Sequence, residues 1–419
     1  MENVLNSYFS GSKMEYTDGD FSHIAQLLRR TECSKYSKTP RLYTLLRFLG
    51  RLDDLDRLLK SGLFDYSLPL SDTQLPSDFT QSWKKEFLYA QHLVCDNSDV
   101  VQMISMEKHM NFIQEPDCFI RERFIGEGGR GKVDEVFCIF SGQFYARKQI
   151  LRQIMSVSDV AAAAAFRNEV ENIKRVIHHH CVQLVASYTD PYVFAFLMLP
   201  VADCNLAEYL KAAVESRNNR TFLLDFFGCL SRGLWHIHRQ ELRHRDIKPE
   251  NILVSNHKVL FTDFDCSYDW SHTMHSTTIG VPPRTRQYAS PEVAHSRLHE
   301  HVRVNSSSDI WSLGCVFLEI FTVWKGRSLQ VLNDLKGSYY WANVEGICQW
   351  IEELRGISTL PSVNMTFEWI QEMLRDDPNK RPTAQKLVEM TSEFCCVKCK
   401  AEDSRPIKEG AALQTEGRF

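Results

Sequence analysis

The first segment whose residue types suggest a phosphate-binding site is a run of regularly spaced glycines. The run IGEGGRGKV begins at Ile125 and places Gly126, Gly128 and Gly131 between two segments with the alternating pattern of β-strands. Because glycine has no Cβ, such a turn lets backbone N–H groups approach phosphate oxygens closely. A dinucleotide-binding loop would lead into a helix, whereas here a strand follows. The spacing favours a loop that covers phosphates, although an ordinary glycine hairpin gives the same pattern.

A lysine lies on the next predicted strand. Ala146 and Lys148 are two residues apart and therefore share one face of that strand. Lys148 would bring a positive charge to the α- and β-phosphates of a nucleotide, and a buried ammonium needs a carboxylate partner to stay charged. We interpret Glu169 as that partner, because Ile173 and Val176 would turn the same side of its helix inward. Taken alone, Glu169 would more often lie on an exposed helix surface.

The most specific segment is LRHRDIKPENIL at 242–253. It combines His-Arg-Asp with a lysine two residues after the aspartate and an asparagine five residues after it. In this form the segment resembles the serine/threonine branch of the eukaryotic protein kinase superfamily. The resemblance extends over about residues 119–392, two thirds of the chain, because further kinase motifs follow in the expected order. The N-terminal block and VADCNLAEYL also resemble kinases of filamentous fungi, which is a weaker match.

The resemblance implies a role for each polar residue of these motifs. Asp246 would be the catalytic base that orients the substrate hydroxyl, Lys248 would steady the γ-phosphate, and Asn251 would bind Mg²⁺. Asp263, in the segment FTDFD, would be the second metal ligand, since carboxylate and amide oxygens suit Mg²⁺. The predicted cofactors are ATP and Mg²⁺. The predicted catalytic set is Asp246, Lys248, Asn251, Lys148 and Glu169.

The adenine site is also implied by the resemblance. Alignment of FLMLPVAD places Met198 at the gatekeeper position and Leu199 to Val201 in the hinge. Val133, Ala146 and Leu253 would enclose the ring. The complete predicted ATP-binding set is Ile125, Gly126, Gly128, Gly131, Val133, Ala146, Lys148, Met198, Leu199, Val201 and Leu253.

Other motif residues would hold the site together. In the family, Glu292 of the Ser-Pro-Glu segment pairs with Arg381, Asp309 binds the backbone of the His-Arg-Asp motif, and Thr285 meets the catalytic aspartate and lysine. One position departs from the family, because Asp265 stands where a glycine usually follows Asp-Phe. Asp adopts positive φ at a cost of roughly 1 kcal/mol relative to glycine, so we expect this residue to lower basal activity.

The segment between Asp263 and Glu292 is the expected site of regulation. In the family, an arginine placed like Arg245 binds a phosphate on this segment. Thr277 and Thr278 are the best-placed acceptors, and a phosphate there adds a charge of about −1.5 to −2. The alternative is that these threonines belong to a solvated polar loop.

The surrounding patterns predict the elements. Leucines at 42–59 recur every three or four residues and predict one helix that ends near Gly62; a second stripe at 83–94 predicts another, capped by Ser77. This spacing is typical of helices that pack into a hydrophobic core within their own module. The alternative is that the apolar face binds a regulatory protein. Strand patterns follow from residue 119, then a helix at 157–176 and two more strands. Helical patterns dominate thereafter.

We therefore predict an α+β protein with a bilobal protein kinase fold, in which an antiparallel β-sheet N-lobe and a mainly helical C-lobe follow a helical module. The very apolar helix at 309–323 should be internal. The predicted division is a flexible N-terminus at 1–20, the helical module at 21–117, the N-lobe at 118–200, the C-lobe at 201–393, and a cysteine-containing, largely disordered tail at 394–419.

Composition excludes several classes of protein. Of 419 residues, 43% are hydrophobic and 24% are charged, the mix of an ordinary globular protein. The 49 basic and 53 acidic residues give a net charge of −4, which predicts no general affinity for nucleic acid. We expect no membrane span, since no apolar run reaches about 18 residues. Without a recognisable secretory signal, we expect an intracellular protein, cytoplasmic or nuclear, with mostly free cysteines.

Two segments rich in metal-binding residue types lie outside the motifs. The histidines at 178–180 fall at a predicted helix-to-strand turn, where kinases carry a short His-rich connection, so zinc there is the less favoured interpretation. Cys395, Cys396 and Cys399 offer three thiols, whereas tetrahedral zinc needs four ligands and the neighbouring sequence supplies no fourth. Free thiols are the simpler interpretation, and the sequence leaves metal binding by these cysteines open.

Two other functions share these features. Asp265 and the helical module suggest a pseudokinase scaffold with weak ATP binding, against which the intact polar motif residues argue. A small-molecule phosphotransferase should lack the Ser-Pro-Glu segment and Arg381, and both are present. The predicted function is a serine/threonine protein kinase that transfers the γ-phosphate of ATP to a protein hydroxyl.

Overall fold

The chain forms two compact units in a computed structural model. The first contains the described residues up to Val170 together with Leu184–Leu199, and the second contains Glu171–Gln183 and the described residues from Pro200 onward. The structure describes residues 2–403 except 10–15, 32, 69, 71, 73, 96–103, 105–107, 117, 129–130, 139–140, 153–157, 265–266, 270–285, 296–304 and 357–360.

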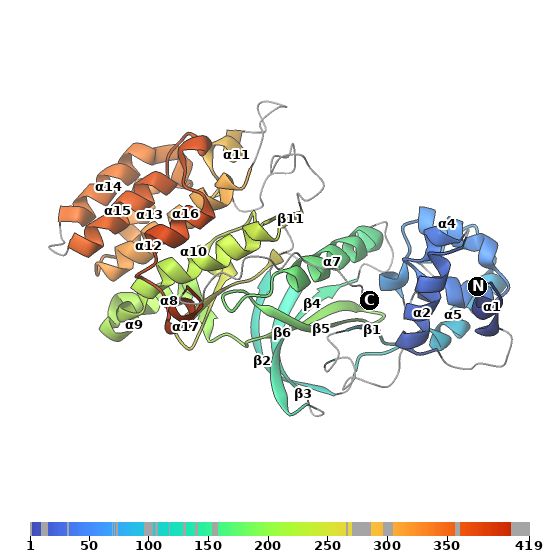
Figure 1. Cartoon of the computed structure of the whole chain (residues 1–419). Helices are drawn as coiled ribbons and strands as arrows, with labels where there is room; N and C mark the ends of the chain where they lie inside the picture. Colours follow the sequence, from blue (N-terminus) through green and yellow to red (C-terminus); the bar gives the residue numbers. More distant parts are fainter. Residues whose placement is uncertain are drawn as a thin grey trace. The chain divides into compact units, whose positions relative to one another are not determined.

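The N-terminal helices share one hydrophobic core. Ile24, Leu45, Leu58 and Phe87 are completely buried in it, so the predicted leucine stripes serve a core of their own. The helices are α1 (Glu2–Ser7), α2 (Asp18–Leu28), α3 (Pro40–Phe48), α4 (Leu55–Lys60) and α5 (Gln81–Ala90) (Figure 1).

Two local predictions for these helices are wrong. The leucines at 42–59 do not form one helix, because Gly50 adopts a left-handed φ of 67° and separates α3 from α4. The second helix is capped by Thr80 instead of Ser77: the Thr80 side chain accepts a hydrogen bond from the backbone N–H of Trp83. In both cases the hydrophobic spacing was correct and the local backbone chemistry decided the boundary.

The sequence predicts loose segments at both ends, and the structure differs at both. Within the flexible segment expected at 1–20, α1 forms and Leu5 and Tyr16 are buried in the helical core. Within the tail expected from 394, residues up to Asp403 are folded and include the helix α17 (Val397–Asp403). Residues 404–419 lie outside the described residues.

A six-stranded sheet follows the helices. Its order is β1-β5-β6-β4-β3-β2. As predicted, β2, β3, β4 and β6 pair antiparallel, whereas β1 pairs parallel with β5 although it lies in the segment assigned to the helical module. The strands are β1 (His109–Asn111), β2 (Phe119–Gly128), β3 (Gly131–Cys138), β4 (Gln143–Leu151), β5 (Gln183–Thr189) and β6 (Val193–Leu199).

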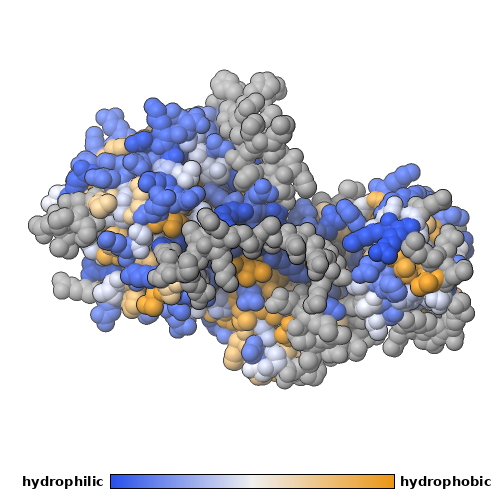
Figure 2. Space-filling model, in the orientation of Figure 1, coloured by the Kyte–Doolittle hydropathy of each residue, from blue (hydrophilic) through white to orange (hydrophobic). Residues whose placement is uncertain are grey.

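The helix α7 (Ser158–Arg175) covers one face of this sheet, as Figure 1 shows. The ring of Phe166 on α7 lies 5.1 Å from the ring of Phe194 and 4.6 Å from that of Phe196, both on β6. Hydrophobic residues also gather on the surface over β2 and β3 in Figure 2, where about half of the Ile120 and Phe124 side chains is exposed. A strand-like hydrophobic pattern therefore does not by itself show burial in this sheet.

The second unit is mainly helical. The helix α12 is internal as predicted, with Trp311 and Phe317 completely buried. On α10, Phe227 and Leu230 face the core, whereas Leu224 is only half-buried. The elements are β7 (Cys204–Asn205), α8 (Leu206–Glu215), α9 (Arg217–Thr221), α10 (Leu223–Arg239), β8 (Leu242–Arg243), β9 (Ile252–Ser255), β10 (Lys258–Phe261), β11 (Tyr268–Asp269), α11 (Pro291–His295), α12 (Ser307–Trp324), α13 (Leu329–Lys336), α14 (Val344–Gly356), α15 (Pro361–Met373), α16 (Ala384–Met390) and α17.

The segment between α16 and α17 lies directly against α10. The backbone N–H of Gly228 donates to the carbonyl of Phe394 at 2.7 Å. A Cβ at Gly228 would overlap that carbonyl, so only glycine allows this approach. The contact fixes the start of the segment that carries Cys395, Cys396 and Cys399.

Candidate functional site

The glycine-rich segment joins β2 to β3 in a hairpin. A Cβ at Gly131 would overlap the carbonyl of Gln149 on β4, so this glycine is required by the packing of the sheet. By contrast, a Cβ at Gly126 would meet none of the described atoms within 4 Å, which leaves space for a ligand. Ile125 lies at an irregular position of the β2–β3 pairing and is 39% exposed. Residues 129 and 130 at the tip lie outside the described residues.

One face of the sheet carries four of the predicted nucleotide-binding residues. In the antiparallel register, Val133 lies opposite Lys148 and Ala146 lies opposite Met198. Because opposite residues share a face, as do residues two apart on one strand, all four project from the same side. Phe196, which contacts α7, lies opposite Lys148 and so marks this as the side that α7 covers.

The remaining hinge and adenine residues divide between the units. Leu199 ends β6 in the first unit, whereas Val201 and Leu253 belong to the second. Leu253 lies on β9 opposite Asn205 of β7 and is half-buried.

Lys148 and Glu169 form the ion pair that the sequence suggested. The Nζ of Lys148 lies 2.7 Å from Oε1 of Glu169, and the two side chains are 12% and 3% exposed. The strand β4 and the helix α7 supply the two partners, and Phe196 lies beneath the ammonium at 5.7 Å. Such a buried pair keeps the lysine charged and fixes the direction of its side chain.

In the second unit, Asp246 is held by two of its predicted neighbours. Lys248 donates to its Oδ2 at 2.9 Å, and Nδ2 of Asn251 donates at 2.9 Å both to that oxygen and to the carbonyl of Asp246. Because the amide nitrogen of Asn251 points at Asp246, its Oδ1 points away and is oriented as an acceptor or metal ligand. Asp246 and Asn251 are buried at 7% exposure each.

Asp263 follows β10 in a strained conformation. Its φ of 65° lies in the left-handed region, which costs a residue with a Cβ about 1–2 kcal/mol. The N–H of Thr262 donates to the carbonyl of Asn251, so the chain before Asp263 runs beside that residue. The next residue, Phe264, is completely buried, and its ring lies 5.2 Å from that of His244. The packing of Phe264 stabilises the left-handed backbone conformation of Asp263.

Asp309 holds the His-Arg-Asp motif through its backbone, as the resemblance implied. Its two carboxylate oxygens accept from the N–H groups of His244 and Arg245, each at 2.9 Å. Arg245 itself has a left-handed φ of 68°, so these bonds stabilise a strained turn. Burial alone would raise the pKa of Asp309, but the hydrogen bond from Nε2 of His238 at 3.0 Å, the nearby His244 and the backbone bonds hold it below its ordinary value of 3.8.

This arrangement predicts a pH dependence. A lowered pKa means that the Asp309 carboxylate stabilises the folded state above pH 3.8 and that this contribution is lost as the pH falls below 3.8. We expect Asp309→Asn to lower the free energy of unfolding by about 1.5–3 kcal/mol at pH 7. The difference from wild type should shrink as the pH approaches 3 in denaturant titrations. Asp334→Asn, at an exposed position, is the control, and a difference that is constant over pH would contradict the argument.

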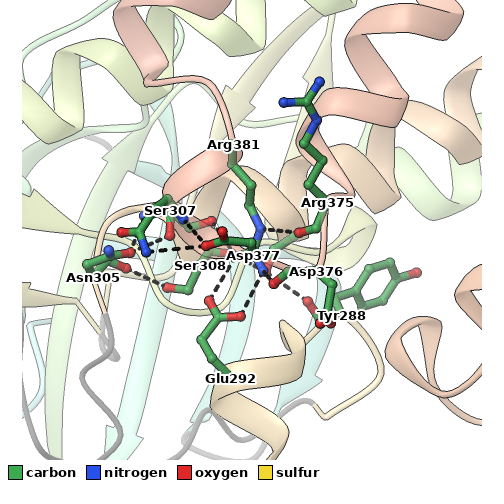
Figure 3. Close-up of polar contacts among 11 residues, drawn as sticks. Tyr288, Glu292, Asn305, Ser307, Ser308, Arg375, Asp376, Asp377 and Arg381 are labelled. Carbon is green, nitrogen blue, oxygen red and sulfur yellow. Dashed lines mark hydrogen bonds and ion pairs between the residues drawn. The ribbon is translucent and has the colours of Figure 1, made fainter.

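Glu292 and Arg381 form a second buried ion pair, which Figure 3 shows. Two guanidinium nitrogens of Arg381 donate to the two carboxylate oxygens of Glu292, each at 2.8 Å. The other N–H groups of Arg381 donate to the backbone carbonyls of Ser307, Arg375 and Asp376. All five donors of the guanidinium are therefore used, and the pair joins α11 to the start of α12 and to the segment after α15.

Comparison with known proteins identifies this arrangement. A sequence model described as the protein kinase domain matches residues 119–391, well over half of the 419 residues. The chain belongs to the protein kinase family.

Curated relatives are 24–30% identical to this chain over the aligned residues. The chain is 30% identical to mitogen-activated protein kinase kinase 2 of Arabidopsis thaliana, over 64% of this chain and 70% of that protein. It is 29% identical to serine/threonine-protein kinase nekl-2 of Caenorhabditis elegans, over 54% of this chain and 60% of that protein. With serine/threonine-protein kinase Nek1 of Mus musculus it shares 26% identity over 65% of this chain. The match to Nek1 covers only 21% of that protein, so the chain spans a part of such relatives. The expected likeness to kinases of filamentous fungi stays a prediction.

The kinase domain contains a buried cluster that sequence reasoning missed. Glu319 on α12 accepts from the hydroxyl groups of Tyr288 at 2.8 Å and of Tyr340 at 2.6 Å. Burial raises the pKa of Glu319, although these bonds and the nearby Lys336 oppose the shift. The cluster ties the residues before α11 to α12. A single acidic residue in the middle of the apolar run at 309–323 was the signal that could have revealed it.

Several residues of the kinase motifs cannot be placed. Asp265, Thr277, Thr278 and Thr285 lie outside the described residues, so the expected effects of Asp265 and of phosphorylation stay predictions. Among the helices that the structure describes, none is both long and apolar enough to span a membrane.

Proposed function

We propose that this chain is a serine/threonine protein kinase that transfers the γ-phosphate of ATP to a protein hydroxyl. The observation that carries the proposal is the set of bonds around Asp246, in which Lys248 and Asn251 fix the carboxylate. A fixed carboxylate beside a cation suits a base that must orient an acceptor hydroxyl. The names of the serine/threonine kinase relatives support the choice of acceptor.

The residues present fit ATP and Mg²⁺. Oδ1 of Asn251 is turned away from Asp246, and Asp263 directly follows Thr262, whose N–H donates to the carbonyl of Asn251, so these two residues would hold the metal. The metal would neutralise charge on the phosphates. Lys148, paired with Glu169, would bind the α- and β-phosphates. The open space at Gly126 would let the glycine-rich segment cover the phosphates. The face with Val133, Ala146 and Met198 would contact adenine, together with Leu199, Val201 and Leu253.

The alternative is a pseudokinase scaffold. It was suggested by Asp265, which lies outside the described residues, whereas the ion pair of Lys148 and the bonds of Asp246 have the form that catalysis needs. The proposal includes the substrate, which would be a protein with a serine or threonine acceptor. It also includes the location of the kinase, which would be intracellular. Partner binding by the N-terminal helices stays a hypothesis, because their leucines are engaged in a core of their own.

Labelled ATP and generic acceptor proteins test the proposal. We expect Mg²⁺-dependent transfer of label to serine and threonine, detected by phosphoamino-acid analysis. Lys148→Met should lower the transfer by about 10²-fold or more, because phosphate positioning is lost. Lys211→Met, which removes an exposed lysine on α8, is the control. Label on small molecules alone, or binding of ATP with no transfer by the wild-type protein, would contradict the kinase and favour the alternatives.

A further inference from the structure

Four side chains outside the proposed kinase site meet in the second unit. His179 and His180 lie in the turn between α7 and β5, and Cys396 and Cys399 lie at the start of α17. One nitrogen or sulfur atom from each of the four lies within 4.8 Å of the corresponding atom of every other member. We call this group the His-Cys cluster. His180 and Cys399 are completely buried, and the other two are half-buried.

The distances in the His-Cys cluster suit a tetrahedral metal site. Nε2 of His179 and Nε2 of His180 lie 3.3 and 3.2 Å from Sγ of Cys399, and Sγ of Cys396 lies 3.6 Å from Nε2 of His180. Zinc binds sulfur at about 2.3 Å and imidazole nitrogen at about 2.0 Å, so a tetrahedron places sulfur and nitrogen about 3.5 Å apart. The observed pairs lie close to that separation.

Hydrogen bonding around His180 is a second, independent observation. Its Nδ1 lies 2.7 Å from the carbonyl oxygen of Val259. A carbonyl only accepts, so Nδ1 must carry the hydrogen, and in the neutral ring Nε2 then presents a lone pair. That lone pair points at the sulfurs of Cys396 and Cys399. A ring nitrogen that donates to a backbone carbonyl while the other faces sulfur ligands is the usual arrangement of a zinc-binding histidine.

The protein holds both halves of the cluster in place. The backbone N–H of Cys396 donates to Sγ of Cys229 on α10 at 3.3 Å, and the contact of Gly228 with Phe394 fixes the residues just before it. On the other side, the N–H of Val182 donates to the carbonyl of Phe261, which holds the histidine turn on β10. The four groups therefore face one another because the fold positions them.

We propose that His179, His180, Cys396 and Cys399 bind one Zn²⁺ ion as a structural site. Two nitrogen and two sulfur donors in a tetrahedral arrangement favour zinc among the common divalent ions. The cysteine segment supplies two ligands, and the other two, His179 and His180, come from a turn about 220 residues earlier in the chain. Zinc would join the C-terminal helix α17 to the turn after α7, and it takes no part in the proposed phosphoryl transfer.

Metal analysis of the full chain tests this site without relying on activity. We expect protein made in zinc-supplemented medium and purified without chelators to contain about one zinc per chain. Cys396→Ser/Cys399→Ser should reduce this to background. Cys395→Ser should retain the zinc, because the Cys395 thiol belongs outside the cluster and donates to the carbonyl of Ser392 at 3.3 Å. Removal of zinc by a chelator should lower the melting temperature of the wild type and leave that of the double variant unchanged.

Cobalt provides a readout that needs no variant. Wild-type protein stripped of zinc and titrated with Co²⁺ should develop sulfur-to-cobalt charge-transfer bands and the visible bands of a tetrahedral ion, and zinc should abolish both. If the double variant fails to fold, this titration still decides. Three results would overturn the proposal. The first is wild-type protein that lacks stoichiometric zinc and gives no such bands with Co²⁺; the second is a double variant that retains zinc. The third is a disulfide between Cys396 and Cys399 in protein purified under reducing conditions.

Discussion

Asp246→Asn is expected to lower phosphotransfer by about 10²–10⁴-fold while ATP affinity stays within about threefold of wild type. Asparagine keeps the shape of the side chain but replaces one acceptor oxygen by an NH₂ group, so the base is removed. Lys248 and Asn251 both donate to the same oxygen, Oδ2, and the bond from Nδ2 of Asn251 to the backbone carbonyl of Asp246 does not depend on the carboxylate. The loss should therefore appear in turnover and leave nucleotide binding in place.

Single-turnover kinetics and ATP titration separate the two quantities. Glu250→Gln is the matched control, because it removes one negative charge from the same loop at an exposed position. We expect that variant to retain wild-type turnover. Phosphotransfer by Asp246→Asn within about threefold of wild type would show that this carboxylate is not the base.

Arg381→Ala is expected to lower the free energy of unfolding by about 3–5 kcal/mol. The substitution leaves the Glu292 carboxylate, which is 12% exposed, without its charged partner, and it also removes the donors to three backbone carbonyls. For a unit of this size we expect the melting temperature to fall by roughly 6–20 °C. Arg381→Lys should recover only part of the loss, since an ammonium cannot reproduce the two parallel bonds to Glu292.

Arg375→Ala provides the control for this measurement. The half-exposed side chain of Arg375 points away from Glu292 in Figure 3, donates to the carbonyl of Lys380 at 3.2 Å and lies 3.9 Å from Glu372. Its removal should cost less than about 1 kcal/mol. Unfolding of Arg381→Ala within 1 kcal/mol of wild type would mean that the buried pair contributes little net stability, as is known for some buried ion pairs.

The resemblance to protein kinases implied the pair of Glu292 with Arg381 and the bonds of Asp309, and the structure contains both contacts. The pairing of Lys148 with Glu169 could be inferred because a buried ammonium needs a carboxylate and one helix offered it. The internal position of α12 followed from an almost uninterrupted apolar run. Periodicity likewise indicated the helices and strands, although Gly50 interrupts one predicted helix.

Features that depend on distant parts of the chain could not be predicted in this way. Asp263 and Arg245 adopt a left-handed backbone conformation, and nothing in the sequence indicated this, because residues with a Cβ normally avoid positive φ. The strand β1 is three residues long, and its parallel pairing with β5 depends on tertiary packing. Both segments of the His-Cys cluster were noticed in the sequence, but their meeting could not be predicted, because local spacing carries no information about a contact between residues about 220 positions apart.

The close approach of Phe394 to Gly228 has a consequence for how the protein is made. Cys229 and Cys396, which mark the two sides of this contact, are 167 residues apart, so at about 5–20 residues per second the ribosome needs on the order of 10–30 s to deliver the second after the first. During that interval Gly228 lacks the nearest neighbours that surround it in the folded chain, which are the carbonyls of Thr391 and Phe394 and the side chain of Cys395. We expect this face of α10 to reach its final packing only after residues 391–395 have left the ribosome.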